Sequence, residues 1–469
     1  MTLIKSISGI RGTIGGNTGD NLTPLDAVKF AAAYGQWLKS ASPGKRLKVV
    51  LGRDARPSGA MIQALVQNTL VGLGIDVIDL GLSTTPTVEM AVVFEKAHGG
   101  IILTASHNPV QWNALKLLNA KGEFLSGDDG KAILAIAEAD QYDFVEVSEL
   151  GTVTVAQGMI EKHIDAILDL PYVNVEAIRE ADLKVAVDAV NSTGGIAIPV
   201  LLDRLGVQRK SLLYCEPNGR FPHNPEPLKE HLGDIMANVK EEGCDLGVVV
   251  DPDVDRLALI SENGEMFGEE YTLVACADYL LGKLKGPVVS NLSSSRALRD
   301  LAQSKGYEYF ASAVGEVNVV TTMKDKKAVL GGEGNGGVIL PDLHYGRDSL
   351  VGIALILSHL ATSGKKMSEL RASYPEYYMA KNKIQLEEGM DVDGLLDQVR
   401  EKYSSENVST IDGVKIDFAE EWVHLRKSNT EPIIRIYTEA KTQERASSLG
   451  ERFVEEIKSI AGAQINAKV

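Results

Sequence analysis

The chain has 469 residues, and a usual size of roughly 100–200 residues per domain predicts three or four domains. Its formal net charge of −16 argues against a nucleic-acid partner, because binding a phosphate backbone requires a basic surface. No apolar run approaches the ~18 residues that span a bilayer, and the first residues lack the basic and long apolar stretches of a secretory signal. We therefore expect no membrane partner.

The three cysteines, Cys215, Cys244 and Cys276, are widely spaced and odd in number. They fit neither a disulfide framework nor a CxxC zinc pattern, so we expect buried, reduced thiols and a cytoplasmic location. The net negative charge also limits how the chain could bind an anionic substrate. An acidic chain that acts on an anion must gather positive charge locally at its binding site.

The first third of the chain alternates helical and strand patterns. Thr23 and Pro24 predict the N-cap and first turn of a helix that extends through Leu38. Strands and helices are then expected to alternate over residues 47–51, 61–73, 77–80, 86–97 and 101–103. This alternation predicts a largely parallel sheet covered by helices.

The same alternation returns twice, over residues 183–250 and 287–330. Each of the three units ends in an apolar strand followed by a polar loop, and these loops are residues 104–109, 251–256 and 331–337. Because ligands bind beyond the carboxyl ends of strands in open α/β sheets, we expect the loops to form one composite site. After residue 383 the pattern is that of a smaller α+β domain. The expected domains are residues 1–155, 156–256, 257–375 and 376–469.

Three carboxylates alternate in the loop Asp-Pro-Asp-Val-Asp-Arg, residues 251–256. This pattern lets Asp251, Asp253 and Asp255 direct oxygen ligands at one hard cation, which suits Mg²⁺. A solvated acidic turn is disfavoured, because few turns place three carboxylates at alternate positions without a counter-ion. An EF-hand is disfavoured, because Arg256 stands where the loop needs glycine and the flanks are strand-like. A haloacid-dehalogenase-type phosphatase, which also carries Asp-x-Asp after a strand, stays open on this loop alone.

Ser106 and His107 follow the strand at residues 101–103. A serine beside a histidine is a candidate nucleophile, although composition alone would favour a polar turn. Lys116, which is conspicuous in the next apolar strand, strengthens the functional interpretation. No Gly-x-Ser-x-Gly elbow surrounds Ser106, so a hydrolase triad is disfavoured.

The glycine-rich loop at residues 331–337 contains a formal G-x-G-x-x-G. A dinucleotide site would need a helix after it, and a strand-like segment stopped by proline follows instead. We interpret it as a flexible loop that lets Glu333 and Asn335 reach the hydroxyls of a ligand. Structural glycine remains the alternative at individual positions.

The basic loop at residues 426–435 combines two guanidiniums, hydroxyls and loop amides. These charge-assisted donors match a phosphate, and each hydrogen bond to a charged group contributes about 1.5–3 kcal/mol. The loop supplies the local positive charge that an acidic chain needs. A solvated basic face is the alternative, which the position of Arg435 in an apolar strand weakens.

Together and in this order, the four loops resemble those of the α-D-phosphohexomutase family, which includes phosphoglucomutases, phosphomannomutases and phosphoglucosamine mutases. The resemblance spans nearly the whole chain. It implies an α/β fold with three similar mixed α/β-sheet domains and a smaller C-terminal α+β domain around a central cleft. It also implies interconversion of hexose 6-phosphate and hexose 1-phosphate through a phosphoserine, with Mg²⁺ as cofactor and hexose 1,6-bisphosphate as bound intermediate and activator.

The resemblance assigns a role to each motif residue. The implied catalytic residues are Ser106, His107, Lys116 and Arg11. The implied metal ligands are Ser106, Asp251, Asp253 and Asp255. The implied substrate-binding residues are Glu333, Asn335, Arg426, Ser428, Asn429, Thr430 and Arg435. In this assignment Ser106 carries the phosphoryl group, Lys116 is the general acid/base, and Arg11 lies near the phosphoserine.

One departure concerns the sugar loop, where many relatives have Glu-x-Ser-Gly-His and this chain has Gly337. The missing histidine leaves a proton-shuttle role open there, for which His344 or Arg347 is a candidate. The Gly-Glu-Gly-Asn-Gly-Gly form, with residues 221–227, is most similar to archaeal-type and Bacteroidetes-type phosphoglucosamine mutases. We therefore favour glucosamine phosphate over mannose and glucose phosphates.

Two further classes are weighed against the mutase. A sugar phosphatase would use the Asp251 loop and release inorganic phosphate. A non-catalytic sugar-phosphate-binding protein would be expected to have lost Ser106 or one of the three aspartates, and all are present. We expect a monomer or homodimer that acts on a phosphorylated hexose.

Overall fold

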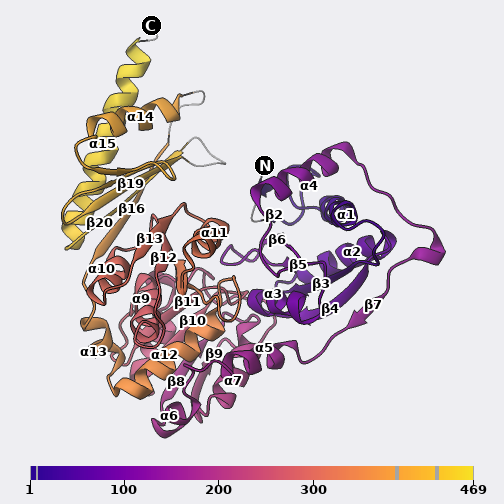
Figure 1. Ribbon diagram of the computed structural model, residues 1–469, viewed down its shortest axis with the longest axis horizontal. Helices are drawn as coiled ribbons and strands as arrows, with labels where there is room; N and C mark the ends of the chain where they lie inside the picture. The colour runs from indigo at the N-terminus through magenta and orange to yellow at the C-terminus, as the bar shows by residue number, and fades with distance from the viewer. Residues whose placement is uncertain (1, 7–8, 386–389, 428–432, 468–469) are drawn as a thin grey trace. The chain divides into compact units, whose positions relative to one another are not determined.

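The computed structural model describes residues 2–6, 9–385, 390–427 and 433–467. The chain divides into two compact units (Figure 1). The larger contains Met1–Lys285 and Val329–Arg371, and the smaller contains Gly286–Ala328 and Ala372–Val469. Among the described helices, none combines the length and the apolar character needed to cross a bilayer.

The larger unit begins with a seven-stranded mixed sheet. Its strands in spatial order are β1 (Ile4–Ser6), β2 (Gly9–Thr13), β6 (Trp112–Leu118), β5 (Gly99–Leu103), β3 (Lys48–Arg53), β4 (Asp76–Leu82) and β7 (Val153–Val155). One face is covered by α1 (Pro24–Ala41), α2 (Gly59–Gly72) and α4 (Gly127–Ala139), and the other by α3 (Thr85–Phe94).

The expectation of a largely parallel first sheet is wrong in part. β5, β3, β4 and β7 are parallel, whereas β6, β2 and β1 each run antiparallel to the neighbour before them. A parallel neighbour needs a crossover of a dozen or more residues. The connection from β5 to β6, residues 104–111, is shorter than that, so β6 turns back beside β5.

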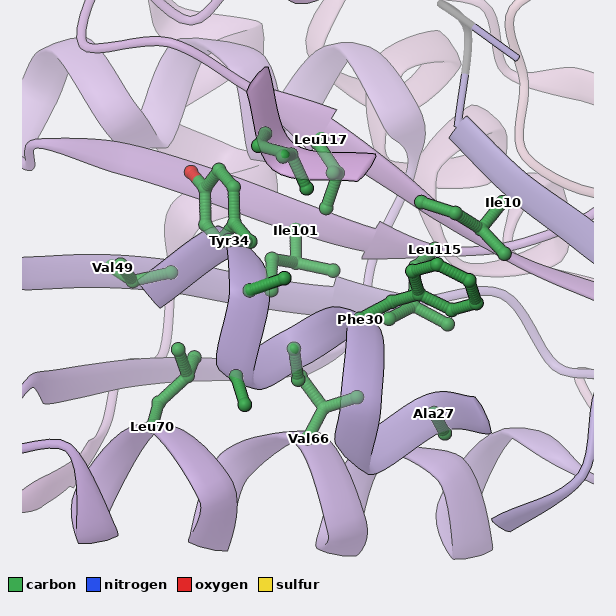
Figure 2. Close-up of a cluster of buried hydrophobic side chains, with 14 of the residues drawn as sticks. Ile10, Ala27, Phe30, Tyr34, Val49, Val66, Leu70, Ile101, Leu115 and Leu117 are labelled. Atoms are coloured by element: carbon green, nitrogen blue, oxygen red, sulfur yellow. The ribbon is translucent and has the colours of Figure 1, made fainter. Parts of the chain in front are cut away.

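The start of α1 agrees with its sequence signal. The Thr23 hydroxyl accepts the N–H of Asp26, and the Asp26 carboxylate accepts the N–H of Thr23, which is a capping box. Phe30 and Tyr34 of this helix pack on the sheet (Figure 2). Burial of each such side chain contributes about 1.5–3 kcal/mol. The Tyr34 hydroxyl donates to the Leu118 carbonyl at 2.7 Å, so its buried polar group is paired.

The second sheet of the larger unit has four strands. They are, in order, β11 (Leu257–Ser261), β10 (Leu246–Val250), β8 (Lys184–Asp188) and β9 (Arg209–Leu213). β9, β8 and β10 are parallel and β11 is antiparallel to β10. The helices of this part are α5 (Met159–Leu168), α6 (Val175–Glu180), α7 (Gly194–Arg204) and α8 (Gly233–Glu241). The unit also contains α9 (Glu269–Leu280), the antiparallel pair β14 (Leu330–Glu333) and β15 (Gly337–Ile339), and α12 (Ser349–Ser363), after which α13 (Met367–Ala372) follows.

The smaller unit is built from two stretches of chain. In the first, β12 (Val288–Asn291) is parallel to β13 (Tyr309–Ser312), with α10 (Ala297–Ser304) and α11 (Glu316–Lys326). The second is an antiparallel sheet of β16 (Tyr378–Gln385), β20 (Ile433–Ala440), β19 (Trp422–Lys427), β18 (Val414–Asp417) and β17 (Asn407–Ser409). Its core packs against α14 (Val392–Lys402) and α15 (Gln443–Ala467). The predicted fold class, mixed α/β sheets followed by an α+β segment, is confirmed.

Candidate active site

Ser106 lies in the short connection between β5 and β6 and is buried, with an exposed fraction of 7%. Its backbone is left-handed, with φ +49°, which costs free energy in any residue with a side chain. The Ser106 N–H donates to Thr104 Oγ1 at 2.9 Å. The surroundings must therefore hold this conformation, which places the hydroxyl at the carboxyl end of the sheet.

The aspartate loop connects β10 to β11 and faces this serine. The Ser106 hydroxyl donates to Asp251 Oδ2 at 2.5 Å, although the two residues are 145 positions apart. The other oxygen, Asp251 Oδ1, accepts the N–H groups of Asp255 and Arg256 at 3.2 Å each. These bonds fix the carboxylate, so the structure brings together the serine and the first aspartate that the sequence singled out.

The other two carboxylates are each held by one oxygen. Asp253 Oδ2 accepts from the Thr85 hydroxyl at 2.6 Å and from Lys116 Nζ at 2.7 Å. Asp255 Oδ2 lies 3.3 Å from Lys116 Nζ and 2.7 Å from Arg347 Nη2. Among the described residues, no hydrogen-bond donor reaches the remaining oxygens, Asp253 Oδ1 and Asp255 Oδ1, and both are buried.

These three aspartates fit a hard divalent cation. Each can offer one carboxylate oxygen, and the three oxygens lie within 4.8 Å of one another. A buried carboxylate oxygen without a partner is costly, and oxygen-rich sites of this kind suit Mg²⁺. The donor set therefore matches the metal that the sequence predicts.

The charges in the site shift the pKa values of its carboxyl groups. Burial, together with the negative charges of Asp255 and Asp253, raises the pKa of Asp251 well above its ordinary value. Burial alone would raise the pKa of Asp255 too, but the charges of Arg347 and Lys116 hold it well below its ordinary value. A cation beside Asp251 would favour its ionised form by the same Coulomb interaction.

Positive side chains surround the carboxylates. Burial would lower the pKa of Lys116, but Asp253 and Asp255 raise it above its ordinary value, so Lys116 is an ammonium. His107 Nδ1 lies 3.4 Å from the Ser106 hydroxyl oxygen. Burial and the positive charge of Arg256 lower the pKa of His107 to about 2, so this imidazole is neutral.

Arg11 lies on β2, where it pairs in register with Ala114 of β6. Burial and the nearby charge of Arg256 lower the pKa of Arg11. Arg11 in turn is one of the charges that lower the pKa of His107. Arg11 therefore adds to the positive charge that acts on His107 of the serine loop.

The glycine-rich loop forms a hairpin turn between β14 and β15, and its expected flexibility stays a prediction. Glu333 ends β14 and faces Gly337 of β15 in register. The Glu333 carboxylate pairs with Arg347 Nη1 at 3.0 Å, and Asn335 Oδ1 accepts the Gly337 N–H at 3.2 Å. Gly336 has φ +86°, a conformation that glycine adopts without strain, so the turn is compact.

Arg347 occupies the space beside Gly337. A Cβ at position 337 would lie 2.4 Å from Arg347 Cδ. His344, the other candidate for the missing histidine, lies 3.3 Å from Asp348 through Nε2 and 3.3 Å from Glu89 through Nδ1. Arg347 thus contacts both the aspartate loop and the glycine-rich turn, whereas His344 is held by other carboxylates.

The basic loop belongs to the smaller unit. Arg426 on β19 and Arg435 on β20 are direct cross-strand partners. Arg426 Nε lies 2.8 Å from Asp412 Oδ2, and Arg435 is exposed. Both arginines therefore sit side by side at the start of the β19–β20 connection. Ser428, Asn429 and Thr430, which the sequence predicts to bind phosphate, lie outside the described residues, as do Glu431 and Pro432.

Two residues that contact the aspartate and serine loops were not predicted from the sequence. Thr85 donates to Asp253 from the first turn of α3, and no motif distinguishes it from an ordinary helix start. Arg56 donates to carbonyl oxygens of the serine loop. A signal for Arg56 existed, since it stands in a charged segment directly after the strand predicted at residues 47–51.

A buried serine that faces three buried aspartates at strand ends of an α/β fold is typical of a phosphohexomutase. The chain belongs to the phosphoglucomutase/phosphomannomutase family, because the models of that family match it almost throughout. They cover α/β/α domain I over residues 3–143, domain II over 161–264, domain III over 268–378 and the C-terminal domain over 380–456.

Known proteins are similar to this chain over nearly their full length. The chain is 37% identical to the phosphoglucomutase/phosphomannomutase of Thermococcus kodakarensis, over 95% of this chain and 98% of the relative. It is 34% identical to the probable phosphoglucosamine mutase of Pyrococcus horikoshii, over 97% of each. The solved structure of a putative phosphomannomutase from Thermus thermophilus superposes with a TM-score of 0.81 at 25% identity, over 97% of this chain and 99% of that one. A family protein from Burkholderia thailandensis gives a TM-score of 0.82 at 24% identity, over 98% of each, which supports the fold.

Proposed function

We propose that this enzyme interconverts hexose 6-phosphate and hexose 1-phosphate through phosphorylated Ser106 and a bound hexose 1,6-bisphosphate. The observation that carries the proposal is the 2.5 Å hydrogen bond from Ser106 to Asp251, in a triad whose other two members each keep a buried, unpartnered oxygen among the described residues. A nucleophilic hydroxyl beside a cation site is what reversible phosphoryl transfer requires.

Asp251, Asp253, Asp255 and a Ser106 oxygen would hold Mg²⁺. When bound, the ion would neutralise negative charge on the transferred phosphoryl group. Lys116 contributes a second, permanent positive charge at the same carboxylates. Phosphoryl transfer depends mainly on positioning and such charge neutralisation, so these groups act without covalent chemistry of their own.

The reaction balances in two half-steps. In the first, the bond from Ser106 Oγ to phosphorus breaks, the oxygen of a free sugar hydroxyl bonds to that phosphorus, and the hydroxyl proton passes to Ser106 Oγ. In the second, the other phosphoryl group of the bisphosphate moves to Ser106 Oγ, and the Ser106 proton passes to the sugar oxygen that has lost this group. Asp251 and neutral His107 contact the Ser106 hydroxyl and orient it. Protonated Lys116 is suited to donate rather than to accept a proton.

We assign recognition of the sugar hydroxyls to Glu333 and Asn335, and recognition of the non-reacting phosphate to the basic loop of residues 426–435. The cross-strand pair of Arg426 and Arg435 supports the second assignment, since adjacent guanidiniums suit a phosphate. The domain division at residues 155, 256 and 375 stays a prediction, as do a cytoplasmic location and a monomeric or homodimeric state.

Glucosamine phosphate is the preferred substrate in this proposal. The names of relatives from Pyrococcus horikoshii and Methanopyrus kandleri, both probable phosphoglucosamine mutases, support it. The second candidate is a glucose or mannose phosphate, which the name of the Thermococcus kodakarensis relative favours. Measuring kcat/KM for the three hexose phosphates, each primed with its own bisphosphate, separates these candidates. An equal or reversed ranking would defeat the glucosamine preference.

The mutase itself is tested by intact mass spectrometry. Protein treated with hexose 1,6-bisphosphate is expected to carry one added phosphate, which maps to Ser106. Ser106→Ala should lose both this phosphate and isomerisation. A phosphatase that used the Asp251 loop would instead keep releasing inorganic phosphate after this substitution, and that result would overturn the proposal.

A further inference from the structure

The serine loop is wound around one buried guanidinium. Arg56 has an exposed fraction of 1% and stands in the connection from β3 to α2. Its Nη1 donates to the carbonyl oxygens of Pro109 and Trp112 at 2.7 and 3.0 Å, and its Nη2 donates to that of Asn108 at 2.7 Å. Nη2 also donates to the carbonyl oxygen of Ser106 itself.

A buried carboxylate completes this arrangement. Asp54 Oδ2 accepts from Arg56 Nε at 2.9 Å and from the Thr104 hydroxyl at 2.7 Å. Thr104 Oγ1 in turn accepts the N–H of Ser106. Both backbone polar groups of Ser106 are therefore held, directly or through Thr104, by the pair of Asp54 and Arg56.

The same segment also reaches the aspartate loop. The Ser192 hydroxyl accepts the N–H of Ala55 at 3.3 Å and donates to the carbonyl oxygen of Pro252 at 2.7 Å. Pro252 stands between the first two aspartates. One hydroxyl thus links the residue before Arg56 to the loop that carries the metal ligands.

We propose that Arg56 is a positioning residue that sets Ser106 Oγ against Asp251, and that Ser192 fixes the aspartate loop to the same segment. The inference rests on the proposed function. Ser106 holds a left-handed backbone that does not persist unaided. Arg56 supplies the fixed fork of donors that four carbonyl oxygens and a carboxylate require, which the single ammonium of lysine cannot reproduce.

The chain offers a matched control at the other end of the same strand. Arg46, which precedes β3, also pairs with a carboxylate, Asp76, and donates to the carbonyl oxygens of Glu149 and Leu150. Its side chain is 47% exposed and it touches neither loop of the site. If Arg56 had a purely structural role, replacing Arg56 and replacing Arg46 would change the transfer rate alike once the difference in stability is accounted for.

The experiment compares Arg56→Lys with Arg46→Lys. Dephosphorylated protein is mixed with hexose 1,6-bisphosphate in a single turnover, and the appearance of phosphate on Ser106 is followed by rapid quench and intact mass. Because a misplacement of about 1 Å costs roughly 100-fold in rate, we expect Arg56→Lys to slow this transfer about 100-fold. Arg46→Lys should stay within about twofold of wild type, with the rates of both variants corrected for the folded fraction.

Two further measurements keep the inference falsifiable if Arg56→Lys folds poorly. Ser192→Ala, which removes only the bridging hydroxyl, should slow the transfer, while KM for the sugar phosphate changes little. Guanidinium ion at low millimolar concentration should restore part of the rate to Arg56→Ala and none to Ser106→Ala. Wild-type transfer rates in folded Arg56→Lys and Ser192→Ala would overturn the inference. Absence of transfer in the wild-type protein would instead overturn the proposed function.

Discussion

Lys116 lies between two buried carboxylates, and its contribution to the site is mainly its charge. It approaches Asp253 at 2.7 Å and Asp255 at 3.3 Å, and its side chain is 12% exposed. Because Asp253 also accepts from Thr85, the ammonium is one of two groups that hold this carboxylate. Lys116 and a divalent cation therefore compensate the same negative charge.

Replacing Lys116 by methionine tests this arrangement. Removing one partner of a buried ion pair typically costs about 3–5 kcal/mol, so Lys116→Met should lower the free energy of unfolding by up to that amount without metal. Added Mg²⁺ should recover more stability in the variant than in the wild type. Urea unfolding with and without Mg²⁺ measures both effects. Lys121→Met, at an exposed position, is the control, and equal Mg²⁺ effects in all three proteins would contradict the charge argument.

Gly337 makes a second residue-scale prediction. A methyl group there would lie 2.4 Å from Arg347 Cδ, so Gly337→Ala should displace Arg347 from Glu333 and Asp255. We expect a stability loss of about 1–3 kcal/mol, as for other overpacked sites, and a larger fractional loss of kcat than of substrate affinity. Gly233→Ala, where no atom lies within 4 Å of the added Cβ, is the control. Unchanged kcat in Gly337→Ala would show that Arg347 does not serve catalysis.

At the scale of elements, a buried polar cluster joins α3, α5 and the N-terminus of α12. His163 on α5 lies 2.9 Å from Asp348, which also accepts the N–H groups of Leu350 and Val351 and so caps α12. His344 lies between Asp348 and Glu89 of α3. The cluster ties down the start of α3, which carries Thr85, and the loop that carries Arg347.

The cluster predicts a pH dependence of stability. Burial would lower the pKa of His344, but Asp348 and Glu89 raise it to about 10. A raised pKa in the folded state stabilises the protein fully below the unfolded value of about 6.5, and this contribution is lost as the pH rises towards 10. The free energy of unfolding should therefore fall between pH 6.5 and 10, and fall less in His344→Gln. Parallel curves for the two proteins in urea titrations would show that His344 is not the group responsible.

At the scale of the whole molecule, the two stretches of chain in the smaller unit are joined by buried charge. Arg296, at the start of α10, is 4% exposed and donates through Nη2 to Asp417 at 3.0 Å and to the Glu421 carbonyl at 3.0 Å. Its backbone N–H donates to Glu439. One arginine from residues 286–328 therefore contacts β18, β20 and the turn between β18 and β19.

Arg296→Met should consequently loosen the C-terminal sheet from the first stretch. The substitution removes the guanidinium charge beside Asp417 and Glu439, and breaking a buried ion pair typically costs about 3–5 kcal/mol. We expect faster amide exchange in β18 and β19 and unchanged exchange in β5 and β10 of the larger unit. Arg400→Met, which breaks only an exposed pair with Asp397, is the control. A uniform rise of exchange in every sheet would indicate global destabilisation instead.

Several helices and loops of this enzyme can be predicted from the sequence, because they depend on residues that are neighbours in the chain. The start of α1 follows from Thr23 and Pro24, and the alternation of Asp251, Asp253 and Asp255 after an apolar strand predicts a metal loop. The antiparallel course of β6 could also have been inferred from its short connection. The hairpin turn at Glu333 could not, since glycine adopts many backbone conformations and a run of glycines specifies none of them.

The amino-acid sequence by itself determined which loops carry chemistry and in what order they come, because capping, strand periodicity and motif spacing act over a few residues. Only the tertiary structure decided that Ser106 meets Asp251 across 145 positions, that Arg56 holds the serine loop and that Arg347 fills the space beside Gly337. Such contacts depend on sheet order and on which side chain occupies a shared volume, and no local pattern in a single chain encodes either.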